Sequence, residues 1–66
     1  MSNIVKNSVN QALIDIYTDK VREEKSIKTK SELITDLDIL KALGDSVITQ
    51  DEYNEILNMI NIEFSE

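Results

Sequence analysis

The chain has 66 residues, 41% of them hydrophobic and 30% charged, with a net charge of −6 and neither cysteine nor histidine. This length allows one domain at most, and the missing side chains exclude disulfides, thiolate–zinc sites and catalysis by histidine. The absence of proline and the single glycine favour long helices over strands. We therefore expect residues 1–66 to form one all-α domain of three helices, the long first helix packing on a C-terminal helical hairpin.

The first predicted helix covers about residues 4–24. Apolar residues recur on one helical face at spacings of three and four: Val5, Val9, Leu13, Ile16 and Tyr17. Ile14 and Val21 lie about 100° or more away from that stripe, which makes the apolar surface wide. Ser2 or Asn3 is expected to cap the start of this helix.

The second predicted helix covers about residues 30–43. It begins at a capping box, in which the Thr29 hydroxyl and the Glu32 carboxylate each accept a free backbone N–H. Its apolar face is formed by three leucines: Leu33, Leu37 and Leu40. Gly44 follows, and a glycine just past a helix readily takes the positive φ angle that ends it.

The third predicted helix covers about residues 50–63. Thr49 and Glu52 form a second capping box, and Ile48 is placed to pack on Tyr53 as a hydrophobic staple. The apolar stripe is the clearest in the chain: Tyr53, Ile56, Leu57, Ile60 and Phe64. We expect this hairpin of two capped helices to be the best-defined part of the fold.

Metal binding and catalysis find little support. The turn before Glu52 is similar to the second half of a calcium loop, but Lys41 and Leu43 then take positions that must coordinate the ion. Asp36 and Asp38 are two residues apart and diverge on a helix, and the serines have no histidine to activate them. We expect a non-enzymatic protein with no metal, no cofactor and no catalytic residue.

Nucleic acids and membranes are also disfavoured partners. Residues 31–66 carry one basic and nine acidic side chains, a balance of −8, and this charge repels phosphate. Five basic residues lie between Lys20 and Lys30, where a solvated helix end is the simpler interpretation and a phosphate contact the alternative. No apolar run approaches the roughly 20 residues that span a bilayer. With no secretory signal pattern and no cysteine, we expect a cytoplasmic protein.

The hairpin resembles the short helical-hairpin domains called SHOCT-type. Their pattern has a leucine-bearing helix, a glycine turn, Ile-Thr, two polar residues, then Glu and an aromatic residue. The matching residues are Leu40, Leu43, Gly44, Ile48, Thr49, Glu52 and Tyr53. Two extra turn residues depart from the pattern, and the match covers residues 40–53, about a fifth of the chain. The resemblance implies an adaptor or oligomerisation module, several members of which belong to phages or mobile elements, and it assigns no site.

We expect the protein to act by binding another protein or itself. The predicted first helix is about 31 Å long and the other two about 21 Å, so part of its apolar surface would stay uncovered. Such surfaces mark contact sites, and a two-fold homodimer is the simplest contact. The candidate interface residues are Ile14, Val21 and Phe64. A break near residues 17–18, folding the helix back, is the competing outcome.

Two other functions remain open at this point. The first is an acidic inhibitor that occupies a basic nucleic-acid-binding surface of an enzyme, steered there by the −8 balance of residues 31–66. The second is a DNA-binding regulator built on a helix–turn–helix of the last two helices. Residues 50–66 contain five acidic side chains and no lysine or arginine, which argues against that regulator.

Overall fold

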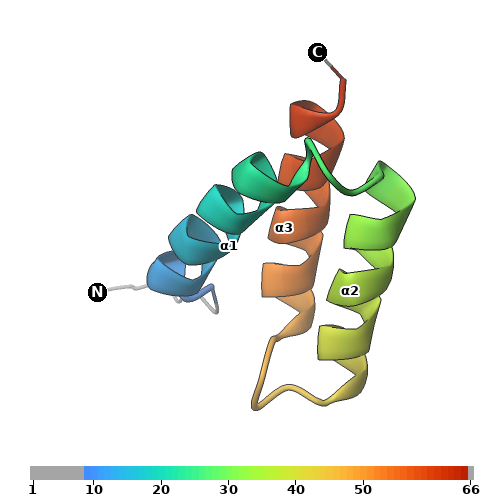
Figure 1. Cartoon of the computed structure of the whole chain (residues 1–66). Helices are drawn as coiled ribbons and strands as arrows, with labels where there is room; N and C mark the ends of the chain where they lie inside the picture. The colour runs from blue at the N-terminus through green and yellow to red at the C-terminus, as the bar shows by residue number, and fades with distance from the viewer. Residues whose placement is uncertain (1–8, 66) are drawn as a thin grey trace.

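The computed structural model describes residues 9–65, which form three helices: α1 (Gln11–Glu24), α2 (Lys30–Ala42) and α3 (Gln50–Glu63). No strand occurs in this part of the chain. α3 packs against both α1 and α2, which contact each other less, and α1 and α2 diverge away from the connector that joins them (Figure 1). The all-α, three-helix fold predicted from the sequence is confirmed.

The start of α1 differs from the prediction. Asn10 has an extended backbone, and its side-chain oxygen accepts the backbone N–H groups of Ala12 and Leu13 at 3.1 and 3.3 Å. The predicted helix at residues 9 and 10 is therefore wrong. The physical reason is that an asparagine side chain at the helix start satisfies N–H groups that would otherwise have no partner.

The expected excess length of the first helix is also absent from the described residues. α1 has 14 residues, as α3 does, so the hairpin and α1 match in length. Residues 4–8 and the predicted caps Ser2 and Asn3 lie outside the described residues. α1 continues without interruption through residues 17–18, so the alternative of a break at that point is wrong.

Both capping boxes and the glycine stop are confirmed. Thr29 and Glu32 exchange hydrogen bonds with each other's backbone N–H at the start of α2, and Thr49 and Glu52 do the same at the start of α3. Gly44 has a φ of 109° directly after the C-terminal cap of α2. Local chemistry therefore sets both ends of the turn between α2 and α3, and α3 has the predicted bounds.

The core lies where the three helices meet. The buried side chains are Ile14, Tyr17, Val21, Leu33, Leu37, Ile48, Ile56 and Ile60. α1 thus turns the face of Ile14, Tyr17 and Val21 inward, and Ile16 of the predicted stripe is 67% exposed. The expectation that Ile14 and Val21 face water is wrong. The apolar arc of α1 was wide enough for several orientations, and packing on α3 selected the one with these two residues inside.

Candidate functional site

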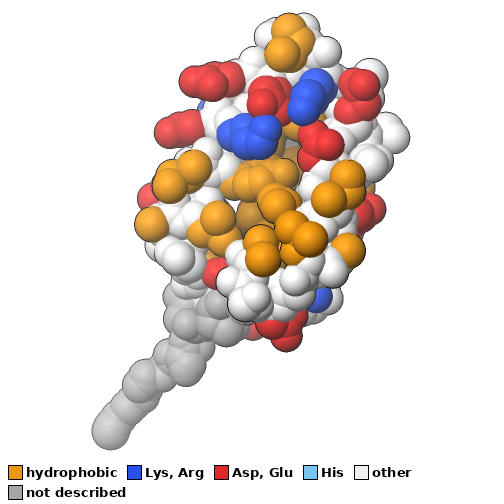
Figure 2. Space-filling view, turned by 60° about the horizontal axis from the view of Figure 1, so that its bottom comes forward, with side chains coloured by type: hydrophobic (Ala, Val, Ile, Leu, Met, Phe, Trp, Pro, Cys, Tyr) orange, Lys and Arg blue, Asp and Glu red, His pale blue; other side chains and the backbone are white. Residues whose placement is uncertain are grey.

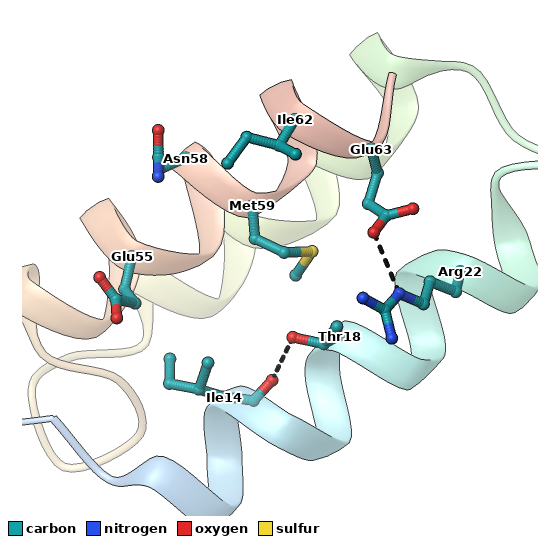
Figure 3. A pocket seen from close by; sticks show the side chains of 8 residues that line it. All are labelled: Ile14, Thr18, Arg22, Glu55, Asn58, Met59, Ile62 and Glu63. Atoms are coloured by element: carbon teal, nitrogen blue, oxygen red, sulfur yellow. Dashed lines mark hydrogen bonds and ion pairs between the residues drawn. The ribbon is translucent and has the colours of Figure 1, made fainter. Parts of the chain in front are cut away.

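A groove of about 280 Å³ runs between α1 and α3. Eight side chains line it: Ile14, Thr18, Arg22, Glu55, Asn58, Met59, Ile62 and Glu63. Figure 3 shows the two helices side by side with the Met59 side chain pointing into the space between them. We call this feature the α1–α3 groove. α2 contributes no side chain to its lining.

The middle of the groove is apolar. Ile14 and Met59 lie at its floor, against the core, and Ile62 is 54% exposed on its α3 side. The Thr18 hydroxyl donates to the Ile14 carbonyl oxygen at 2.7 Å, so this hydroxyl is already satisfied within α1. An apolar side chain entering here would meet the carbon and sulfur atoms of Ile14, Met59 and Ile62, with the polar side chains of Thr18 and Asn58 beside them.

An ion-pair network closes the groove at the C-terminal ends of the two helices. The Glu63 carboxylate accepts from Arg22 Nε at 3.0 Å and from Lys25 Nζ at 3.1 Å (Figure 3 shows the Arg22 pair). The Arg22 and Lys25 side chains together hold the pKa of Glu63 below its usual range. These two cations also lie near the negative end of the α1 dipole, which favours them. We call this the closed end.

The opposite end of the groove, at the helix N-termini, is acidic; we call it the open end. Glu55 lines the groove, and Asp51 lies one turn before it on the same side of α3. On α1, Asp15 and Asp19 follow Ile14 and Thr18 by one residue and are exposed. A helical residue is turned by about 100° from its predecessor, so neither acid points into the groove as Ile14 and Thr18 do.

Glu52 fastens α1 to α3 beside the open end. Its Oε1 accepts the Thr49 N–H at 2.8 Å within the capping box, and its Oε2 accepts the Asn10 N–H at 2.8 Å, from the residue that caps α1. Hydrogen bonds from these two backbone groups, Thr49 first, lower the pKa of Glu52. The side chain is only 6% exposed. Together with Glu63 at the closed end, Glu52 holds the two walls of the groove at fixed spacing.

The basic cluster between Lys20 and Lys30 is largely neutralised. Lys20 and Lys28 both pair with Glu24, at 2.6 and 3.3 Å, and Lys28 also contacts Asp36 of α2 at 2.9 Å. These pairs lower the pKa of Glu24, chiefly through the hydrogen bond from Lys20. Because the lysines already face carboxylates, this cluster is a poor surface for phosphate.

The structure offers no ligand set for a metal within residues 9–65, where no group of three or more carboxylates is gathered. Both oxygens of Glu52 accept backbone N–H groups, and Asp45 contacts Lys41 at 3.4 Å. Among the same residues, no helix is long and apolar enough to cross a membrane.

A second apolar surface lies away from the groove. Figure 2 shows hydrophobic side chains gathered on the face that comes forward when the bottom of Figure 1 is turned toward the viewer. In the turn between α2 and α3, Leu43 and Val47 are 63% and 42% exposed. Charged side chains of both signs occupy the upper part of the same view.

The three candidate interface residues have separate places. Ile14 lines the floor of the groove, Val21 is fully buried in the core, and Phe64 is partly buried against the core at the end of α3. Sequence reasoning missed Met59 and Ile62, which line the groove. Their spacing of three residues on a second face of α3 was the available signal.

Comparisons with protein-family models, with curated proteins and with solved structures find no match to this chain. The resemblance of residues 40–53 to SHOCT-type hairpins therefore stays a prediction.

Proposed function

We propose that this protein is a non-enzymatic interaction module that binds a partner protein through the α1–α3 groove. The observation that carries the proposal is a groove with an apolar middle, open to solvent, between two helices that are held at both ends by Glu52 and Glu63. A groove fixed in advance loses little conformational entropy when a partner enters it. Grooves between helices are a common receptor for an apolar helix face of another protein.

Self-association is the second form of this proposal, and a different surface favours it. Its first basis, exposure of Ile14 and Val21 on an overlong helix, does not hold, because both side chains are buried. Leu43 and Val47 instead present apolar surface at the turn between α2 and α3. Exposed apolar surface on a small domain marks a contact site, and a homodimer through this turn would cover it.

The acidic-inhibitor function is supported by the charge distribution. Five basic side chains take part in ion pairs with carboxylates, namely Lys20, Arg22, Lys25, Lys28 and Lys41. Exposed acids, including Asp15, Asp19 and Glu55, dominate what remains, so the surface can steer toward a positive cleft. A DNA-binding regulator has the weakest support, because the exposed Asn54 and Asn58 stand among acids on α3.

The remaining parts of the proposal rest on composition. A cytoplasmic location suits a chain without cysteine. The many isoleucine, asparagine and lysine residues suggest an AT-rich genome, such as that of a low-GC bacterium or its phage.

A pair of matched variants tests the groove as the interface. Ile62→Glu places a charge in the groove, and Ile39→Glu makes the same change on α2 at a similar exposure, 57% against 54%. Tagged wild type and both variants are used to capture partners from the native host, identified by mass spectrometry. We expect Ile62→Glu alone to lose the partner. Equal capture by all three proteins, each folded by circular dichroism, would overturn the proposal.

Salt and sedimentation separate the alternatives. Binding through the groove relies mainly on its apolar middle and should weaken only modestly as salt rises, whereas an acidic inhibitor of a basic surface loses affinity steeply as salt rises. Sedimentation equilibrium on wild type and Leu43→Glu/Val47→Glu tests self-association. A wild type that stays monomeric at hundreds of micromolar excludes the homodimer, and a dimer that the double variant abolishes supports it.

A further inference from the structure

We propose that the α1–α3 groove receives a basic amphipathic helix of the partner, with its cationic end beside Glu55 and Asp15. This inference rests on the proposed function and names the chemistry of the occupant. It follows from the size of the groove, its position between two helices and the unequal charge of the two ends.

The size and shape of the groove favour a helix. α1 and α3 run side by side, and each has 14 residues, or roughly 21 Å of length. The volume of about 280 Å³ is close to the lower limit of the roughly 300–1,000 Å³ typical of sites that enclose a small molecule, and it is large enough for only a few side chains. An elongated groove between two helices instead accepts a few apolar side chains from one face of a third helix, spaced three or four residues apart.

The apolar middle determines where those side chains enter. Met59 has a flexible thioether side chain, and Ile14 and Ile62 flank it with branched carbon surface. Thr18 and Asn58 form the polar edges, and the Thr18 hydroxyl is engaged within its own helix. One or two large aliphatic or aromatic side chains would bury Ile62, the most exposed carbon surface of the groove.

The charge difference between the ends orients the occupant. At the closed end the Glu63 carboxylate faces two cations, Arg22 and Lys25, so no uncompensated negative charge is left for a basic partner there. At the open end the exposed Glu55 lines the α3 wall, and the exposed Asp15 of α1 directly follows Ile14, which lines the other wall. Lysine or arginine side chains of a bound helix are attracted to the open end and repelled at the closed end.

The same charges disfavour the competing occupants. A second copy of this chain would bring further acids to the open end, since the protein carries a net charge of −6. A nucleic acid would bring phosphates to Glu55 and Asp15. A basic helix from another protein is the occupant that satisfies both the apolar middle and the acidic open end.

Designed peptides test the inference directly. Three peptides of about 15 residues share one leucine stripe, spaced for a helix face, and carry lysine, glutamine or glutamate at one end. Each is titrated into ¹⁵N-labelled protein, and amide shifts are followed by NMR. We expect the lysine peptide to shift the amides of Thr18, Asn58, Met59 and Ile62, and to bind about tenfold more tightly than the glutamate peptide at low salt.

A matched pair of double variants assigns the preference to the open end. Glu55→Gln/Asp15→Asn removes the acid that lines the open end and the exposed acid that follows Ile14, and Asp38→Asn/Asp45→Asn removes two exposed acids of α2 and the turn after it, neither of which adjoins a lining residue. The first variant is expected to lose the preference for lysine and to keep binding the glutamine peptide. The second variant is expected to keep the preference for lysine and to keep binding the glutamine peptide. Equal binding of the three peptides by the wild type, or shifts that map outside the groove, would overturn the inference.

The outcome also separates this inference from the proposed function. If no peptide binds in the groove but Ile62→Glu still abolishes capture of the host partner, the groove is an interface and the basic-helix inference is wrong. If no peptide binds and Ile62→Glu captures the partner normally, both are wrong. Groove shifts that depend only on the concentration of the protein itself would identify a second copy as the occupant and would overturn the inference.

Discussion

The two capping boxes share a sequence pattern and differ in what they hold. At the start of α2 the Glu32 side chain is exposed and accepts one backbone N–H, that of Thr29, at 2.8 Å. At the start of α3 the Glu52 side chain is buried and accepts two, from Thr49 and from Asn10, which lies 42 residues earlier in the chain. One box only caps the start of a helix, and the other also joins two helices.

The difference shows that a local motif acquires a tertiary role through its neighbours. A capping carboxylate has two oxygens, and the motif uses only one of them. At Glu32 the second oxygen is left to solvent, whereas at Glu52 the start of α1 packs close enough to use it. The orientation of α1 on α3, and with it the α1–α3 groove, therefore depends on a residue that sequence analysis assigned to α3 alone.

The largest expected effect comes from removing the two carboxylates in turn. Glu52→Ala leaves the Thr49 and Asn10 N–H groups without their acceptor, and we expect a loss of about 2–3 kcal/mol in the free energy of unfolding. Glu32→Ala removes one exposed hydrogen bond and should cost about 0.5–1 kcal/mol. Urea denaturation of both variants measures the difference. Equal losses would show that the Asn10 contact contributes nothing to stability.

The turn that leads into the second box is the next test. Gly44→Ala puts a Cβ where nothing lies within 4 Å, so the cost comes from the positive φ of 109° alone. We expect a loss of about 1–2 kcal/mol in unfolding free energy. Ser46→Ala, in the same exposed turn, is the control and should be nearly neutral. A Gly44→Ala variant as stable as the wild type would refute the role of Gly44 as the stop of α2.

The threonine hydroxyls of the two boxes should differ less than the carboxylates. Thr49→Ala and Thr29→Ala each remove one acceptor of a helix N–H, and a lost cap costs about 1 kcal/mol. An unchanged denaturation midpoint for Thr49→Ala would contradict the capping role. A clearly larger loss of stability for Thr49→Ala than for Thr29→Ala would show that the hydroxyl, like the carboxylate, has gained a tertiary function.

Acid titration should give the smallest effect, because it removes only the charge of the carboxylate. The pKa of Glu52 lies below its ordinary value of 4.5 in the folded protein. Its contribution to stability is therefore complete above about pH 4.5 and is lost as the pH falls through the folded pKa. Glu52→Gln lacks this contribution. The difference in unfolding free energy between the wild type and this variant should therefore shrink below pH 4.5. A deficit that stays constant with pH would show that the charge of Glu52 does not stabilise the fold.

The wild type and Glu52→Gln both retain the other carboxylates with lowered pKa values, Glu24 and Glu63. The difference between the two stability curves therefore isolates Glu52. The slope of unfolding free energy against pH that both proteins share in acid comes from the paired carboxylates, Glu24 and Glu63, together.

The hairpin could be predicted from the sequence because short-range chemistry determines it. Thr29, Gly44 and Thr49 act on residues within four positions along the chain, and the structure confirms each of them. The apolar stripe of α3 was narrow enough to give one inward face. The fold class and the bounds of α3 followed from these local rules, while the start of α1 did not, because Asn10 could equally be helical or a cap until its surroundings were known.

The groove could not be predicted, because it depends on contacts between residues about 40 positions apart. By itself the sequence determined three helices, two capped starts, one glycine stop and an acidic second half, all of which depend on neighbouring residues or on composition. Only the tertiary structure decided which face of α1 is buried, with Ile14 and Val21 inside and Ile16 outside. The physical reason is that α1 has a wide apolar arc, so its rotation is set by packing on α3 and by the hydrogen bonds from the Asn10 N–H to Glu52 and from Arg22 to Glu63.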